Sequence, residues 1–297
     1  MKNTKENKKK AAEKAAKKAA NEKRLETMRA NLAKLETEAS GILAKGDSMT
    51  AADRARLLDL VNVAYHDSGK IEGCYSIDSC AACDFCQRMI SAAAADPLMI
   101  CGCCYAAADA WKEAAWRRHN LNARIFSTVL FTAEELTALA IGPRCRFNED
   151  GDTVNATMAR NYLRIASTRP GTHFGYWYKN APAVAEGLQA EGIRSRDQLP
   201  DNVRFIHSSA MIGFAAAACW FDDAIFTVYP DEETTAAAIA GGAHECNGRR
   251  CRACGYTCYL MTRRAEPLHI AEYLRTNAAR RASIRAAYDA RKAARRA

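Results

Sequence analysis

The chain has 297 residues, of which 49% are apolar, which suits one large domain of the α/β-barrel size or two smaller ones. The formal charge of +9 comes from the two ends, because residues 1–24 and 275–297 each carry +7 and leave −5 for the middle. No run of about 18 apolar residues occurs, and the N-terminus has the basic region of a secretory signal without its apolar stretch. We therefore expect a cytoplasmic protein with an acidic body and no membrane partner.

Residues 1–46 consist mainly of Ala, Lys and Glu, and apolar residues recur at helical spacing between Met28 and Leu43. This pattern predicts a basic helical arm that ends near Gly46. Residues 275–297 predict a basic helical tail of similar character, which leaves a Cys-rich domain over residues 47–274. Each end is interpreted as a solvated helix, a short coiled coil or a nucleic-acid contact, and the last of these would depend strongly on salt.

The segment "TAADRARLLDLVNVAYHD", residues 50–67, predicts an amphipathic helix with Thr50 as its N-cap and Asp53 at the third helical position. After a cysteine-rich stretch, residues 105–140 are mostly helical in pattern. Thr132 is expected to cap a helix with two glutamates in its first turn.

Thirteen cysteines are present, and eleven of them fall within residues 74–104 and 246–258. Such dense spacing in a reducing compartment indicates metal ligands rather than disulfides. The first group contains a CxxCxxC run and the knot "CGCC", formed by Cys80, Cys83, Cys86, Cys101, Cys103 and Cys104. Cys86, Cys101 and Cys104 are predicted to make a three-thiolate iron site with an open position for S-adenosylmethionine. Cys80 and Cys83 would then belong to a neighbouring site or to none, and a closed zinc site from four of the six is the alternative.

From residue 144 the pattern alternates between short β-branched or aromatic runs and helical or turn stretches. The runs are "RCRF", "THFGYWY", "VRFIHSS" and "AIFTVY", and the intervening stretches are "ATMARNYLRIAST", "APAVAEGLQAEG" and "FAAAACW". This alternation predicts an α/β fold with a parallel sheet, hence a complete or partial β/α barrel.

Polar residues follow the predicted strands, at the ends where barrel enzymes carry their chemistry. Asp152 and His207 are predicted to accept or deliver a proton, and Lys179 to hold an anionic group of a cofactor or nucleotide. Asn155 and Ser208 are predicted to line the same pocket as cofactor-binding residues. Asp152 as a helix cap and Lys179 as a solvated strand end are the structural alternatives.

The second cysteine group has the pattern CxxxxCxxCxxxC, formed by Cys246, Cys251, Cys254 and Cys258. Neighbouring thiolates at these spacings can converge on one centre, and the glycines at 248 and 255 allow the backbone to curl around it. Four soft ligands suit zinc or an iron–sulfur cluster, and the run is more similar to a ferredoxin loop than to a zinc ribbon. His244 is a further candidate ligand.

Eight segments, in this order, give the chain a resemblance over residues 69–262 to the phage gene-product-eighty-eight-like proteins. They are "GKIEGCYSI", "FCQRM", "ICGCCYA", "RFNEDGDTVN", "HFGYWYKN", "LPDNVRFIHSSA", "FTVYP" and "CRACGYTCY". The resemblance implies a phage-encoded protein, distantly similar to radical S-adenosylmethionine folds, with cysteine clusters at Cys86, Cys101 and Cys104 and from Cys246 to Cys258. The CxxxCxxC signature of radical enzymes is absent, and the pair Cys80 and Cys83 and the basic arms are departures from the family.

Two functions follow from these features. The first is an iron–sulfur protein with a radical-enzyme-like fold, one or two clusters, S-adenosylmethionine as cofactor and a small-molecule or nucleic-acid substrate. The second is a nucleic-acid-binding phage accessory protein in which zinc joins each cysteine group and the basic ends contact phosphates.

Overall fold

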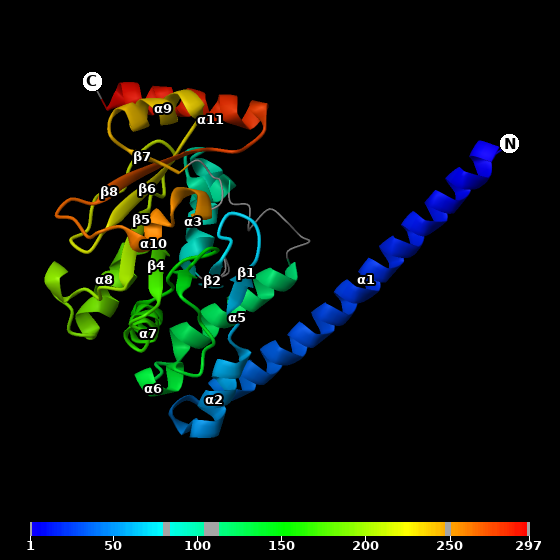
Figure 1. Cartoon of the computed structure of the whole chain (residues 1–297), viewed down its shortest axis with the longest axis horizontal. Helices are drawn as coiled ribbons and strands as arrows, with labels where there is room; N and C mark the ends of the chain where they lie inside the picture. Colours follow the sequence, from blue (N-terminus) through cyan, green and yellow to red (C-terminus); the bar gives the residue numbers. More distant parts are fainter. Residues whose placement is uncertain (1, 80–83, 104–112, 247–250, 296–297) are drawn as a thin grey trace.

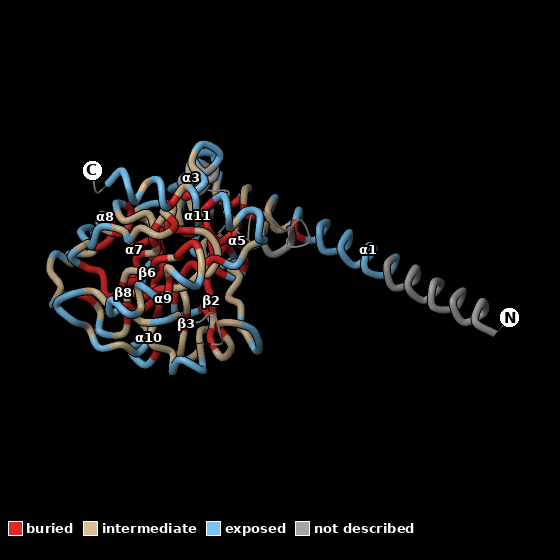
Figure 2. The backbone as a smooth tube through the Cα atoms, turned by 90° about the horizontal axis from the view of Figure 1, so that it is seen from above, coloured by how far each residue is buried: buried red, intermediate tan, exposed pale blue. Residues whose placement is uncertain are grey.

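The structure is a computed structural model that describes residues 2–79, 84–103, 113–246 and 251–295. Side chains are described within these ranges except for residues 2–18, 84–87, 90, 93 and 113–115. One long helix extends from an α/β body (Figure 1), and the buried residues concentrate in that body (Figure 2).

The helices in these ranges are α1 (Lys2–Leu43), α2 (Ala51–Leu60), α3 (Asp84–Ala95), α5 (Glu113–Thr128), α6 (Ala133–Leu136), α7 (Ala156–Ser167), α8 (Ala181–Ala190), α9 (Glu232–Ala240), α10 (Thr257–Leu260) and α11 (Ala278–Ala294). The short 3₁₀ turns are η1 (Gly46–Ser48), η2 (Ile100–Cys103), η4 (Arg196–Gln198) and η5 (Cys251–Cys254). The strands are β1 (Ala64–His66), β2 (Cys74–Ile77), β3 (Arg144–Phe147), β4 (His173–Tyr178), β5 (Val203–Ser208), β6 (Ala224–Tyr229), β7 (His244–Glu245) and β8 (Leu268–Tyr273).

All eight strands belong to one sheet with the order β1-β2-β3-β4-β5-β6-β8-β7. Only the β1–β2 pair is antiparallel, and every other neighbouring pair is parallel. The carboxyl ends of β2 to β8 therefore meet at one edge of the sheet, here called the carboxyl edge. Residues that follow different strands are brought together there.

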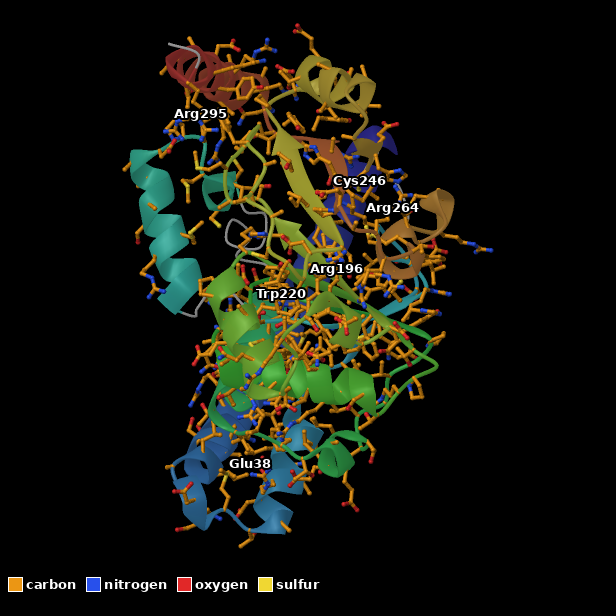
Figure 3. All side chains as sticks on the ribbon, turned by 90° about the vertical axis from the view of Figure 1, so that its left-hand side faces the viewer. Glu38, Arg196, Trp220, Cys246, Arg264 and Arg295 are labelled. Carbon is orange, nitrogen blue, oxygen red and sulfur yellow. The ribbon has the colours of Figure 1, made fainter. Side chains whose placement is uncertain are left out.

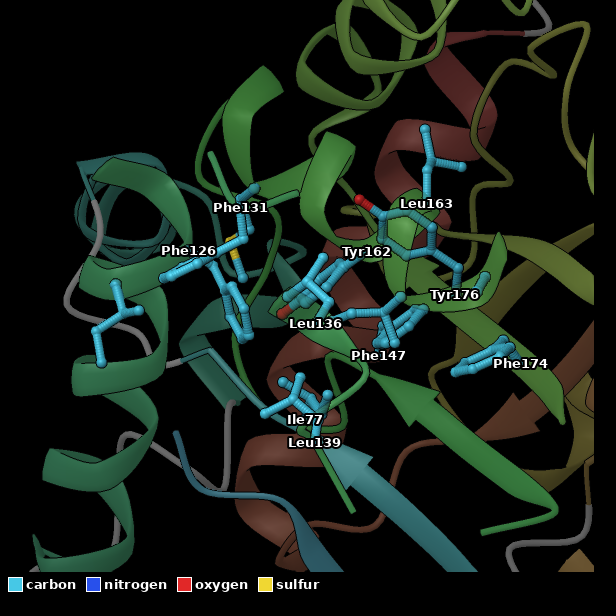
Figure 4. Close-up of a cluster of buried hydrophobic side chains, with 14 of the residues drawn as sticks. Ile77, Phe126, Phe131, Leu136, Leu139, Phe147, Tyr162, Leu163, Phe174 and Tyr176 are labelled. Carbon is cyan, nitrogen blue, oxygen red and sulfur yellow. The ribbon is translucent and has the colours of Figure 1, made fainter. Parts of the chain in front are cut away.

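One face of the sheet is covered by helices. Phe147 of β3 and Phe174 and Tyr176 of β4 point to this face, while the residues between them point to the other face of the sheet. These three side chains are buried in one cluster with side chains of α5 and α7 (Figure 4). Phe147 stacks on Tyr162 of α7 with the ring centroids 4.3 Å apart. Burial of each such ring contributes about 2 kcal/mol. This face carries the largest cluster of buried residues among those described.

The opposite face, here called the inner face, carries Trp177, Ile206, Phe226 and Ile270. It is covered by the segment that contains the second cysteine group, because Cys246, Cys258 and Met261 pack against these side chains. The ring of Tyr259 lies over Gly175 of β4, where an added Cβ would be 3.2 Å from a ring carbon. The small residue at position 175 thus lets α10 approach the sheet closely.

The C-terminal helix α11 packs on the body near the carboxyl edge. Its Ile284 and Tyr288 are buried against Leu98, Ile212 and Leu274. Arg285 Nη1 lies 2.6 Å from Asp231 Oδ2, and Arg291 Nη2 lies 2.8 Å from Asp96 Oδ2. Part of the positive charge of the tail is therefore neutralised within the fold.

The N-terminal helix α1 docks through its C-terminal part, where Leu32 is buried and Ala39 and Ile42 enter the helix-covered core. Glu36 forms an ion pair with Arg117 of α5 at the same place. The rest of α1 extends away from the body (Figure 1). Among the described residues, no helix combines the length and apolar character needed to cross a bilayer.

The predicted α/β class with a largely parallel sheet is confirmed, and the four predicted strands correspond to β3, β4, β5 and β6. The helix predicted over residues 50–67 ends at Leu60, and residues 64–66 form β1 instead. The reason is tertiary: the Asn122 side chain accepts the backbone N–H of Asn62 and donates to its carbonyl, which replaces helical hydrogen bonds there. The stretch "FAAAACW" is not helical.

Candidate metal centre

The segment that carries the second cysteine group is hydrogen-bonded to neighbouring elements at Cys246 and at Cys251. The backbone N–H of Cys246, just after β7, donates to the carbonyl of Ala271 in β8 at 2.8 Å. The backbone N–H of Cys251 donates to the carbonyl of Lys70 at 2.6 Å. Cys246 lies beside the sheet in Figure 3. The segment is therefore tied to the sheet and to the loop between β1 and β2.

Between η5 and α10 the chain reverses through two left-handed residues, Gly255 with φ +67° and Tyr256 with φ +58°. A non-glycine residue in this region is unusual, and two contacts hold Tyr256 there. Its N–H donates to the carbonyl of Cys251 at 2.9 Å, and its hydroxyl donates to the carbonyl of Glu72 at 3.1 Å. This reversal places Cys258 back beside the start of η5.

All four thiols line one cleft, here called the cysteine cleft, which has an empty volume of about 490 Å³ including space open to solvent. The other lining residues are Lys70, Arg146, Trp177, His244, Glu245, Thr257, Tyr259 and Ile270. The four cysteines predicted to share one site therefore line the same cleft, but no three of their sulfur atoms lie within 4.8 Å of one another. Their convergence on one metal stays a prediction. His244 lines the same cleft, so it stays a candidate ligand.

Burial controls the protonation of these thiols. It raises the pKa of Cys251 to about 11 and that of Cys258 to about 12. The neighbouring thiols raise both values further by repulsion between thiolates, and the Arg146 guanidinium lowers them. At neutral pH both thiols are protonated, so any metal that binds them must displace their protons.

Two features indicate what would fit the cleft. The indole N–H of Trp177 is buried and has no hydrogen-bond partner among the described residues, so the cleft offers a donor to an acceptor atom of a bound group. The Arg146 guanidinium lines the cleft over the Trp177 ring and complements a negatively charged group, whereas Lys70, which also lines the cleft, forms an ion pair with Glu272 at 2.8 Å. A cluster whose sulfur atoms accept hydrogen bonds and carry negative charge satisfies both features.

The spread of the thiols bears on the choice between zinc and iron. Four sulfur atoms bound to one tetrahedral zinc at about 2.3 Å lie about 3.8 Å from one another. Among the described residues, the sets of ligand atoms that lie within 4.8 Å of one another are His207, Cys219 and Asp222, and His66, Asp78 and Glu149. The four thiols of the cleft form no such set. Binding of one zinc ion by all four thiols would therefore require their sulfur atoms to move closer together.

The first cysteine group lies largely outside the described residues. Cys80, Cys83 and Cys104 fall in undescribed stretches, and Cys86 is in α3 with its side chain undescribed. Cys101 and Cys103 are half-buried in η2. The N–H of Ile100 donates to the carbonyl of Ala210 just after β5. The η2 turn therefore lies at the carboxyl edge, and α3 begins a few residues after β2 reaches that edge.

The predicted catalytic residue Asp152 is buried and held by backbone donors. Its carboxylate accepts N–H groups of Thr153 at 2.7 Å, Lys179 at 2.8 Å and Asn180 at 3.2 Å. Burial raises the pKa of this carboxyl group, and the Lys179 cation and these hydrogen bonds lower it. These contacts join the loop after β3 to the end of β4, so Asp152 has a structural task. Its role in proton transfer stays a prediction.

The predicted cofactor ligand Asn155 caps α7, since its Oδ1 accepts the N–H of Met158 at 3.1 Å and its Nδ2 donates to the carbonyl of Ser127. Ser208 is half-buried at the end of β5. Neither arrangement identifies a bound cofactor, so both assignments stay predictions.

The predicted base His207 lies on the helix-covered face, where its ring stacks on Tyr178 with the centroids 4.9 Å apart. Its Nδ1 lies 3.3 Å from Oδ2 of the buried Asp222. Burial, followed by the Lys179 cation, lowers the pKa of His207 to about 4. The Lys179 charge thus lowers the pKa of both Asp152 and His207. The three predicted catalytic residues therefore lie near one another at the ends of β4 and β5.

A second group of polar side chains lies near the carboxyl ends of β2 and β3 and was not predicted from the sequence. It comprises His66, Asp78, His119, Glu149 and Asp150. His66 was assigned to a helix, and His119 comes from α5, so these side chains converge from four separate parts of the chain. The histidines had no spacing signal that could have identified them.

Comparison of the chain with known family models, curated proteins and solved structures finds no match.

Proposed function

We propose that this protein is an iron–sulfur protein in which Cys246, Cys251, Cys254 and Cys258 hold a four-iron cluster. The observation that carries the proposal is the cysteine cleft itself, in which four thiols, two cations and a buried indole donor line one space. When bound, the cluster would supply one-electron transfer or a structural link between β7, η5 and α10.

The residues of the cleft would each have a distinct task around the cluster. The thiolates are the ligands, and Lys70 and Arg146 stabilise the negative charge that the cluster and thiolates carry together. Trp177 donates its indole N–H toward a sulfur atom. The inner face of the sheet, with Phe226 and Ile270, shields the cleft from water on one side.

We further propose that the sheet is a partial β/α barrel of the radical S-adenosylmethionine type, in line with the resemblance to the phage family. The six successive parallel strands β2 to β6 and β8 support this relationship. The CxxCxxC run begins immediately after β2, the first of these strands, and η2 lies at the same carboxyl edge. Cys86, Cys101 and Cys104 would hold a second cluster with an open position for S-adenosylmethionine, and the polar residues after β3 to β5 would contact the substrate.

The relative positions of the two cysteine groups support a relay of electrons between them. Cys103 packs against the cluster of buried residues around Ile212, whereas Cys246 and Cys258 pack against the cluster around Phe226. Val228 of β6 packs against both clusters. Val228 thus links the buried cluster that Cys103 contacts to the one that Cys246 and Cys258 contact.

Anaerobic purification followed by iron, sulfide and zinc analysis tests the proposal. We expect a brown protein with about four irons and four sulfides per cluster. The variant C251A/C254A should lose one cluster, and C101A/C104A should lose only the other, with C219A as the control that loses neither. A colourless protein with stoichiometric zinc would overturn the proposal in favour of a zinc-joined, nucleic-acid-binding protein with basic ends.

A further inference from the structure

One compact set of ligand atoms includes no cysteine sulfur. His66 Nε2, a carboxylate oxygen of Asp78 and one of Glu149 all lie within 4.8 Å of one another. The His66 Nε2 to Glu149 Oε2 distance is 3.4 Å. Nitrogen and oxygen ligands at about 2.1 Å from one tetrahedral ion lie about 3.4 Å apart, so this separation suits two ligands of a shared metal.

The carboxylate of Asp78 is oriented by its surroundings. Its Oδ1 accepts the backbone N–H of Glu149 at 2.6 Å, and its Oδ2 accepts the hydroxyl of Ser76 at 2.6 Å. His66 Nε2 lies 2.8 Å from that same hydroxyl oxygen. Such hydrogen bonds fix the direction of a metal-ligating carboxylate such as Asp78. A metal bound to His66 Nε2 would replace the contact of that nitrogen with Ser76.

Glu149 is held far less tightly. Its carboxylate lies near His66 but accepts no hydrogen bond from any described residue. A quarter of the His66 side chain and of the Glu149 side chain is exposed, 25% in each case, so an ion can reach the site from solvent.

His119 is an independent indication of a missing partner. It is only 8% exposed, and neither of its ring nitrogens makes a hydrogen bond within the described residues. Nε2 lies 3.8 Å from Asp78 Oδ2, and Nδ1 lies 3.6 Å from Asp150 Oδ2. A buried imidazole that faces two carboxylates beyond hydrogen-bonding distance points to a group not yet bound there.

We propose that His66, Asp78 and Glu149 bind one divalent transition-metal ion, with His119 and Asp150 beside its open coordination position. Two carboxylates and one imidazole supply oxygen and nitrogen ligands without sulfur, which suits Mn²⁺, Fe²⁺, Co²⁺ or Zn²⁺. Three protein ligands leave room for water or for an oxygen of a substrate, as in catalytic sites.

This site would be close to the iron–sulfur chemistry but independent of it. The Arg146 charge acts on His66 and Glu149 as well as on Cys251 and Cys258. Asp78 is two residues before Cys80 in the chain. No ligand is shared with the cysteine cleft, so the two proposals can fail separately.

Anaerobic titration of the full-length protein with Co²⁺ tests the site, because nitrogen and oxygen ligands give weak visible bands without the near-ultraviolet absorption of cobalt thiolates. We expect one equivalent to bind with this signature in the wild type and in C251A/C254A. H66Q and E149Q should each weaken that binding by at least about 10-fold. H173Q and E134Q, which change exposed residues elsewhere, should bind as the wild type does.

Circular dichroism of each variant shows whether it folds. Wild-type affinity in both H66Q and E149Q would place the ion elsewhere and overturn the assignment. Absence of any nitrogen- and oxygen-type Co²⁺ signature in the wild type would also overturn it. Should one of the two variants fail to fold, the other decides between these outcomes.

Discussion

Metal binding in the cysteine cleft should depend steeply on pH, because Cys251 and Cys258 hold their protons tightly. Burial raises the pKa of these thiols to about 11 and about 12. A metal binds the thiolate, so it must displace a proton from each of them at any pH below about 9. The sign follows directly: affinity falls as the pH falls.

The magnitude follows from the number of protons released. Two displaced protons change the apparent affinity by about 100-fold per pH unit, which corresponds to about 2.7 kcal/mol. The variant C258A removes one of the two protonated thiols. Its metal affinity should therefore change by only about 10-fold per pH unit.

The assay is a Co²⁺ titration of metal-free, reduced protein between pH 6.5 and 8.5, followed by thiolate-to-cobalt absorption in the near ultraviolet. C219A serves as the control, because Cys219 lies outside the cleft and should leave the dependence unchanged. A change in affinity of 10-fold or less per pH unit in the wild type would refute the reasoning, since it would mean that fewer than two buried thiols lose protons on binding.

Three further predictions concern single residues. Trp177→Phe should lower the reduction potential of the cluster measured by voltammetry, because it removes the indole donor; an unchanged potential would mean that the indole does not donate to the cluster. Gly151→Ala should lower the free energy of unfolding by about 3 kcal/mol or more in denaturant titrations, because an added Cβ would lie 1.6 Å from the carbonyl oxygen of Ser79 at φ +86°. Gly192→Ala is its control, with φ +79° and open space, and should cost only about 1 kcal/mol; equal losses would contradict the close approach. Asp152→Ala should cost about 3 kcal/mol in the same assay, because three backbone N–H groups lose their acceptor, and a loss below about 1 kcal/mol would show that the carboxylate is not structural.

The regular parts of the fold could be predicted because their signals are local. The run His173–Tyr178 is short and rich in aromatic residues, which indicates a strand whatever surrounds it. The predicted caps Thr50 and Thr132 are confirmed, because each cap contact is with a residue only three positions away. The short strand β2, "CYSI", has no such signal, because its pairing with β3 involves residues about 70 positions further on.

The two candidate metal sites differ in how far apart their residues lie in the sequence. Three of the four cleft cysteines lie within eight residues, so their spacing alone predicted a common centre. Lys70, Arg146 and Trp177 reach the cleft from a loop and from two strands, and no local pattern links them to it. His66, Asp78, His119 and Glu149 converge only after β1, β2, β3 and α5 have packed together. Each of them is an ordinary polar residue in its own segment.

The central claim is that the cysteine cleft holds a cluster of iron and sulfur rather than a single ion. X-ray absorption at the iron and zinc edges of anaerobically purified C101A/C104A protein tests it most directly, because only the cleft can then hold a cluster. The account predicts iron surrounded by sulfur, with a second shell of iron at short distance, and loss of that signal when Cys251 and Cys254 are also replaced. Zinc bound by four sulfur atoms, with no iron shell, would contradict it.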